Sequence, residues 1–379
     1  MADVSNPAGK AECLKHIFEN AERDGIDLSV LPFLDEALYS ISELGNLSEP
    51  SLCFEGATKI DTHTHPVPSW FRELDPMAGG RPTPEWNVIR HLHFNAERGI
   101  KRSILCVSTP QANAFPGDKA KTLALARLLN EYVAEVVRLY PDRFSWLAIT
   151  ALPYVEESIR EVRYAIGELG AIGVGILTNH DGLYPGASEF DGLWAQLQER
   201  EEDNVVVFIH PTDSVLRLED GQLVNANPTP FRAGLGDFYF ETARAISSIT
   251  ASGTILRYPK LDWRISHGAG AFPDLQDRFL LGFPDIADKA RAVYATRFWY
   301  DSAGPVYPRQ VRGLLVHEIP ESQLVFGTDY PYGMGFFNYD DNIANLENAD
   351  FLSEQQKEGV LFRNSEKLWK AWLPAAEQA

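Results

Sequence analysis

The chain has 379 residues, 45% of them hydrophobic, so it is long enough to bury the core of one large domain. Its formal net charge of -19, from 53 acidic and 34 basic residues, argues against general binding to nucleic acid or to an anionic membrane surface, because like charges repel. The three cysteines, Cys13, Cys53 and Cys106, have no CxxC spacing, and we expect them to be reduced thiols.

Residues 1–55 are predicted to form a helical extension, because apolar side chains recur at helical spacing through Leu28, Leu31, Leu34 and Leu38. The first residues lack the basic start, apolar stretch and cleavage site of a secretory signal. No later window approaches ~20 uninterrupted apolar residues. We therefore expect a cytoplasmic protein without a membrane segment.

Residues 56–379 are predicted to form a (β/α)8 barrel domain, because short β-branched or aromatic runs alternate with longer stretches of helical period. An example of the helical stretches is 118–139, which Pro141 ends. About 250 residues is typical of such a barrel, and no GxGxxG or P-loop motif follows a strand. The eight predicted strands are 58–61, 103–107, 144–149, 172–177, 205–209, 262–266, 298–301 and 324–327.

Polar side chains end four of the predicted strands. The first strand, in TKIDTHTHP, delivers His63 and His65, which point to the same side because extended chains alternate. The fifth, VVVFIHP, delivers His210, the sixth, DWRISHGAG, delivers His267, and the eighth, QLVFGTDYP, delivers Asp329. Since the carboxyl ends of barrel strands meet at one mouth, we expect these five side chains to lie together.

Imidazole nitrogen and carboxylate oxygen are suitable ligands for a divalent ion such as zinc. Three or four protein ligands with an open position are typical of a catalytic site. A single histidine after a strand is more often a hydrogen-bonded core residue. Five such residues at the same end of four strands favour a catalytic ion.

These motifs resemble those of the amidohydrolase superfamily, and within it the branch that contains 2-amino-3-carboxymuconate 6-semialdehyde decarboxylase and the salicylate, resorcylate and 6-methylsalicylate decarboxylases. The resemblance covers about residues 58–370 and rests on HTH, FIHP, SHGAG and FGTDYP, with GAIGVGILTNHDG and FDGLWAQL between them. It implies that His63, His65, His210 and Asp329 bind one metal ion. It also implies that His267 acts beside the ion as an acid–base or substrate-polarising group.

The resemblance also bears on the number and kind of metal ions. Binuclear relatives bridge two ions with a lysine at the end of strand four, but residues 175–179 contain no lysine. Some decarboxylases of the branch have ExH where this chain has HxH, so His63 favours zinc, with manganese as the alternative.

The resemblance implies a homodimeric, non-oxidative decarboxylase of a small hydroxyaromatic or related unsaturated carboxylic acid. In that reaction the metal would chelate the carboxylate and hydroxyl, Asp329 would carry a proton to the ring carbon, and His267 would polarise the hydroxyl. The alternative is a metal-dependent hydrolase or hydratase of a lactone, amide or enol acid, because the branch also contains such enzymes. A non-catalytic barrel would be expected to have lost ligands, and none is lost.

Other side chains are candidates for second roles. Arginine forms bidentate pairs with carboxylates, although it is more often a surface residue. A tyrosine near the mouth would wall an aromatic pocket or pack in the core. Asp301, at the end of strand seven, would orient a histidine. The candidates for substrate binding are Arg81, Arg232, Arg278, Tyr332 and His180, and the histidines expected to be structural or solvated are His16, His91, His93 and His317.

Overall fold

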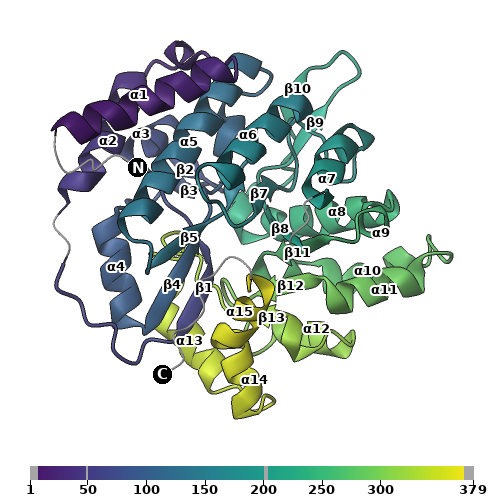
Figure 1. Ribbon diagram of the computed structural model, residues 1–379. Helices are drawn as coiled ribbons and strands as arrows, with labels where there is room; N and C mark the ends of the chain where they lie inside the picture. Colours follow the sequence, from purple (N-terminus) through teal and green to yellow (C-terminus); the bar gives the residue numbers. More distant parts are fainter. Residues whose placement is uncertain (1–6, 48–49, 200–203, 371–379) are drawn as a thin grey trace.

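A parallel β-barrel surrounded by helices is seen in the computed structural model, which describes residues 7–47, 50–199 and 204–370 (Figure 1). This confirms the predicted fold class. Two backbone hydrogen bonds join the first strand to the segment after the last strand and so close the barrel. The N–H of Thr62 donates to the carbonyl of Phe326 (2.9 Å), and the N–H of Asp329 donates to the carbonyl of His63 (2.8 Å). In order around the barrel, the strands are β1 (Lys59–Thr64), β4 (Ile100–Leu105), β5 (Phe144–Trp146) with β6 (Ala148–Ile149), β7 (Val174–Leu177), β8 (Val205–His210), β11 (Leu261–Ile265), β12 (Phe298–Asp301) and β13 (Leu324–Val325).

Some strand boundaries differ from the prediction. The first strand continues to Thr64, because its carbonyl accepts from the N–H of Cys106 on the neighbouring chain segment (3.0 Å). His63 therefore lies within β1, and His210 is the last residue of β8. The predicted strand 144–149 is divided at Leu147, so that β5 pairs with β4 and β6 pairs with β7.

Helices cover the outside of the barrel. The predicted helix 118–139 is α5, which begins one residue later because the Asp118 side chain caps it by accepting from the N–H of Lys121. The helices that follow the strands include α4 (Val88–Glu97), α5 (Lys119–Leu139), α6 (Val155–Gly167), α7 (Asp191–Gln198), α8 (Asp237–Ala251), α9 (Thr254–Arg257), α10 (Phe272–Leu280), α11 (Ala287–Thr296) and α12 (Gln310–Val316). The C-terminal helices are α13 (Tyr339–Glu347), α14 (Glu354–Glu358) and α15 (Asn364–Leu368), with a π-helical turn at Gly359–Arg363.

Two N-terminal helices, α1 (Pro7–Arg23) and α2 (Leu34–Glu43), lie beside α5 and α6 (Figure 1). Their buried side chains, among them Ile17 and Leu38, belong to the same apolar cluster as the barrel helices. The division of the chain at residue 55 stays a prediction. Cys53 and Cys106 are free thiols, and the side chain of Cys13 lies outside the described part. Within the described residues, no helix has the length and apolar character needed to cross a lipid bilayer.

Two small hairpins, which the sequence patterns did not predict, extend from the barrel. They are β2 (Met77–Ala78) with β3 (Arg81–Pro82), and β9 (Val215–Arg217) with β10 (Leu223–Asn225). The first turns through Gly79 and Gly80, whose φ angles of 55° and 77° favour glycine. A Cβ at Gly79 would also approach the Phe238 ring to 3.1 Å, so glycine lets this hairpin pack closely against α8.

Candidate active site

Four of the predicted strand-end residues form one buried cluster. His63, His65, His210 and Asp329 each offer a nitrogen or oxygen atom, and these atoms lie within 4.8 Å of one another. Asp329 Oδ1 is 3.2 Å from His65 Nε2 and 3.5 Å from His63 Nε2. Asp329 has a φ of 62°, a left-handed conformation that turns the chain sharply just after β13. We call these four residues the mouth cluster.

The partners of two histidines determine which ring nitrogen carries the proton. His63 Nδ1 lies 2.8 Å from Asp301 Oδ2, and His65 Nδ1 lies 2.8 Å from the carbonyl oxygen of Cys106. Both partners accept hydrogen bonds only, so each Nδ1 is the donor in the neutral ring and each Nε2 keeps a lone pair. The two Nε2 atoms nevertheless lie only 3.0 Å apart.

The mouth cluster therefore brings acceptors against acceptors. Two nitrogen lone pairs and a carboxylate oxygen converge, and with both histidines neutral no proton lies between them. His210 adds a buried Nδ1 atom that has no hydrogen-bond partner among the described residues. Buried polar atoms without partners are costly. A divalent cation satisfies all four groups, so the donor set fits a metal ion.

Electrostatics favour, in His63, His210 and Asp329, the protonation states that a metal requires. Burial, together with the neighbouring His65, lowers the pKa of His63 and of His210 well below the usual value. Burial alone would raise the pKa of Asp329, but the nearby His65, His63 and His267 outweigh it and lower that pKa. Neutral imidazoles and an ionised carboxylate are the forms that bind metals.

His267 lies beside the mouth cluster and is held separately from it. Its backbone N–H donates to Asp301 Oδ1 (2.8 Å), and its ring Nδ1 donates to the carbonyl of Ala303 (3.1 Å). The ring centre is 4.9 Å from that of His63. Because Nδ1 is occupied, Nε2 is the nitrogen left for a substrate in the adjoining pocket.

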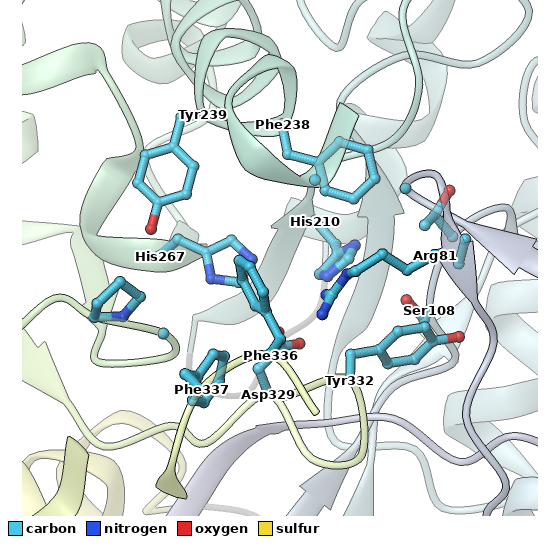
Figure 2. A pocket seen from close by; sticks show the side chains of 16 residues that line it. Arg81, Ser108, His210, Phe238, Tyr239, His267, Asp329, Tyr332, Phe336 and Phe337 are labelled. Carbon is cyan, nitrogen blue, oxygen red and sulfur yellow. The ribbon is translucent and has the colours of Figure 1, made fainter. Parts of the chain in front are cut away.

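A pocket opens above the cluster, and His210, His267 and Asp329 belong to its lining (Figure 2). Arg81 extends into it toward His210 and Asp329, with its guanidinium 4.0 Å from the centre of the Phe336 ring. Arg81 is the one lysine or arginine among the described lining residues. The walls are aromatic, from Phe238, Tyr239, Tyr332, Phe336 and Phe337, with the small residues Ala78, Gly79, Ser108 and Gly304 between them.

The structure brings two of the candidate substrate-binding residues to this pocket, Arg81 and Tyr332. It places the other three elsewhere. Arg232 is exposed and packs against Gly80, outside the lining residues, and Arg278 is exposed on α10. His180 is buried, and both ring nitrogens already have partners, Asn113 Oδ1 (2.7 Å) and the N–H of Leu177 (3.1 Å). The four histidines expected to be structural or solvated, His16, His91, His93 and His317, do not line the pocket.

Sequence reasoning missed most of the pocket wall and two charges beneath the cluster. Phe238 and Tyr239 begin a helix, and no spacing marks them as lining residues. Asp61 and Arg264 are buried inside the barrel. A signal exists for Asp61, which lies two residues before His63 on the same strand and so points to the same side. Arg264 lies three residues before His267, so alternation from that histidine does not mark it.

The fourth barrel strand, β7, carries no lysine that could bridge two ions. Gly175 lies where a Cβ atom would come within 2.3 Å of Cys106 Sγ. A side chain at this position would therefore clash with the Cys106 thiol. The arrangement suits one metal ion better than two.

Comparison with known proteins agrees with this geometry. The model of the amidohydrolase family matches residues 60–371. The chain belongs to the amidohydrolase family. It is 30% identical over 294 residues to 6-methylsalicylic acid decarboxylase from Aspergillus aculeatus, covering 72% of this chain and 84% of the relative. The fold resembles a crystal structure of an amidohydrolase II (TM-score 0.73, 26% identity, 83% of this chain and 100% of the other).

Another amidohydrolase-fold structure resembles this one at lower identity. It is 5-carboxyvanillate decarboxylase from Novosphingobium aromaticivorans, in complex with manganese and 4-hydroxy-3-methoxy-5-nitrobenzoic acid. The TM-score is 0.66 at 19% identity, with 83% of this chain and 97% of the other covered. At this identity the likeness concerns the fold alone.

Proposed function

We propose that the protein is a metal-dependent, non-oxidative decarboxylase of a small hydroxyaromatic carboxylic acid. The observation that carries the proposal is the position of the mouth cluster directly beneath an aromatic pocket. Among the described lining residues of that pocket, Arg81 is the one lysine or arginine. The relationship to a 6-methylsalicylic acid decarboxylase supports the same reaction. That the enzyme is a cytoplasmic homodimer stays a prediction.

The ion is proposed to be held by His63, His65, His210 and Asp329, one per chain. Three imidazoles and one carboxylate favour zinc by ligand type. Manganese is the alternative, because it is present in the related 5-carboxyvanillate decarboxylase structure. When bound, the ion would supply positive charge that orients the substrate carboxylate and hydroxyl and stabilises charge developing on them.

The protein's own groups would handle binding and proton transfer. The aromatic walls would bury the substrate ring, and the Arg81 guanidinium would pair with its carboxylate. Loss of CO2 leaves an electron pair on the ring carbon, and a proton must be added there. Asp329, ionised in the free protein, is proposed to take up a proton from water or from the substrate hydroxyl and then pass it to that carbon, and His267, through Nε2, to hold the ring hydroxyl.

A hydrolase or hydratase would use the same metal ligands, so the test must trace which atoms of the solvent enter the organic product. Purified protein would be incubated in D2O with a panel of hydroxybenzoates, with CO2 and the organic product both measured. We expect release of CO2 and one deuterium at the former carboxylate position. Water oxygen in the organic product, without CO2, would support the hydrolase or hydratase instead.

Asp329→Asn sharpens this test. An amide oxygen can still bind a metal, but an amide does not supply the proton. The variant should therefore keep part of its metal and lose nearly all turnover.

A further inference from the structure

One carboxylate beneath the mouth cluster has all of its acceptor positions filled from defined directions. Asp301 Oδ1 accepts from the backbone N–H groups of His267 (2.8 Å) and Ala303 (3.1 Å). Asp301 Oδ2 accepts from His63 Nδ1 (2.8 Å) and from Arg264 Nη1 (2.5 Å). The carboxylate can therefore neither rotate nor move without breaking several hydrogen bonds.

Arg264 anchors Asp301 from the interior of the barrel. Both side chains are 0% exposed. The guanidinium carbon lies 3.3 Å from the centre of the Phe208 ring, and Nη1 also reaches Thr62 Oγ1 at 3.4 Å. Among the described residues, Nε and Nη2 of Arg264 have no hydrogen-bond partner. A buried cation held mainly by one carboxylate is expensive to keep, and it fixes that carboxylate in place.

We propose that Asp301, anchored by Arg264 and by the backbone at His267, is a positioning residue that holds His63 in the tautomer protonated on Nδ1. Only that tautomer presents a lone pair on Nε2 to the mouth cluster. The inference rests on the proposed metal site and deepens it. It assigns to Asp301 a role in setting which histidine nitrogen is available, in addition to orienting the ring.

Asp301→Asn tests this role. The amide oxygen would keep the two backbone donors, so the amide NH2 would face His63 Nδ1 and Arg264. His63 can accept from that NH2 only by moving its proton to Nε2, which removes the lone pair from the cluster. Loss of such a supporting partner typically lowers metal affinity by about 10–100-fold.

The experiment measures metal affinity by chelator competition with Zn²⁺ and with Mn²⁺, and the His63 tautomer by ¹⁵N NMR of the metal-free protein. We expect wild-type His63 to be protonated on Nδ1, and Asp301→Asn to shift the proton to Nε2 with about 10–100-fold weaker binding. The matched control is Asp262→Asn. Asp262 is also a buried barrel carboxylate, but its partners are Asn204 and Trp299, and the variant should bind metal as wild type does.

If the single variant does not fold, the double variant Arg264→Met with Asp301→Asn removes the unpaired buried cation and should show the same loss of metal affinity. A wild-type spectrum with His63 protonated on Nε2 would overturn the proposal without any variant. Unchanged affinity in a folded Asp301→Asn protein would also overturn it. Neither readout uses a substrate, so a wild-type protein that binds metal but decarboxylates nothing contradicts the proposed function and leaves this inference standing.

Discussion

Two buried polar clusters in this molecule differ in how their acceptors are satisfied. Between α1, α5 and α6, the N-terminal ion network consists of Asp24, Arg127, Asn130 and Glu161. There Arg127 donates to Asp24 (2.6 Å) and to Glu161 (2.9 Å), while Asn130 donates to the other oxygen of Glu161 (2.8 Å). Each carboxylate oxygen of Glu161 thus faces a donor. In the mouth cluster, acceptors face acceptors.

Burial of charge therefore does not by itself mark a functional site. In the N-terminal ion network cation and carboxylates face one another, although Arg127 Nη1 has no hydrogen-bond partner among the described residues. We expect this network to contribute to stability. In the mouth cluster, by contrast, no positively charged side chain of the described residues lies between the acceptors, and a bound cation would fill that place. The following predictions test whether the two clusters are separable in this way.

The largest effect is expected from removing a ligand of the mouth cluster. His210→Ala should lose its bound metal and should lower turnover by more than the roughly 10⁴-fold that removal of an acid–base group can cost. Elemental analysis and CO2 release measure the two quantities. Full metal occupancy in this variant would remove His210 from the ligand set.

A smaller loss is expected at His267, which lies beside the cluster and outside the proposed ligand set. His267→Ala should keep its metal and lower turnover by about 10²–10⁴-fold, because it removes a group that acts on the substrate. Metal content per chain is the discriminating measurement. A metal-free variant would mean that His267 is a ligand.

The opposite pattern is expected in the N-terminal ion network. Arg127→Met leaves buried carboxylates without their cation and should destabilise the fold by about 3–5 kcal/mol, while metal content and turnover of the folded protein stay unchanged. Urea unfolding measures the loss. The control, Arg257→Met, breaks an exposed pair with Asp191 and should cost about 0–1 kcal/mol. A change in metal content with Arg127→Met would mean that the two clusters are coupled.

The smallest effect concerns a histidine with both nitrogens satisfied. Burial lowers the pKa of His180 to about 3, against about 6.5 in the unfolded chain. The unfolded chain therefore takes up the proton first, so this contribution to stability is present above about pH 6.5 and declines by about 1.4 kcal/mol per pH unit as pH falls. When the pH falls from about 7.5 to about 5.5, the free energy of unfolding should decrease less in His180→Gln than in wild type. Urea unfolding at both pH values measures this difference. An equal loss would contradict the assignment.

The sequence predicted the barrel and the residues of the mouth cluster because both depend on local patterns. Alternation along a strand places His63 and His65 on one side, and parallel strands bring His210 and Asp329 to the same end. The functional assignment of these residues stays a prediction. The predicted family and the predicted decarboxylase activity agree with the family match and with the similarity to a known decarboxylase.

Other parts of the site depend on contacts between distant segments, which local patterns do not encode. His180 comes three residues after β7 and His210 ends β8, so both were candidates for the barrel mouth, yet Asn113 and the Leu177 backbone occupy the ring nitrogens of His180. Arg81 reaches the pocket through a glycine turn packed on Phe238, whereas Arg232 stays exposed. Only the folded arrangement distinguishes members of these pairs.

Calorimetric titration of metal-stripped protein tests the difference between the clusters most directly. With Zn²⁺ or Mn²⁺ we expect one binding site per chain in wild type and in Arg127→Met, and no such site in His210→Ala. Absence of binding in wild type, or an unchanged site in folded His210→Ala, would contradict the account.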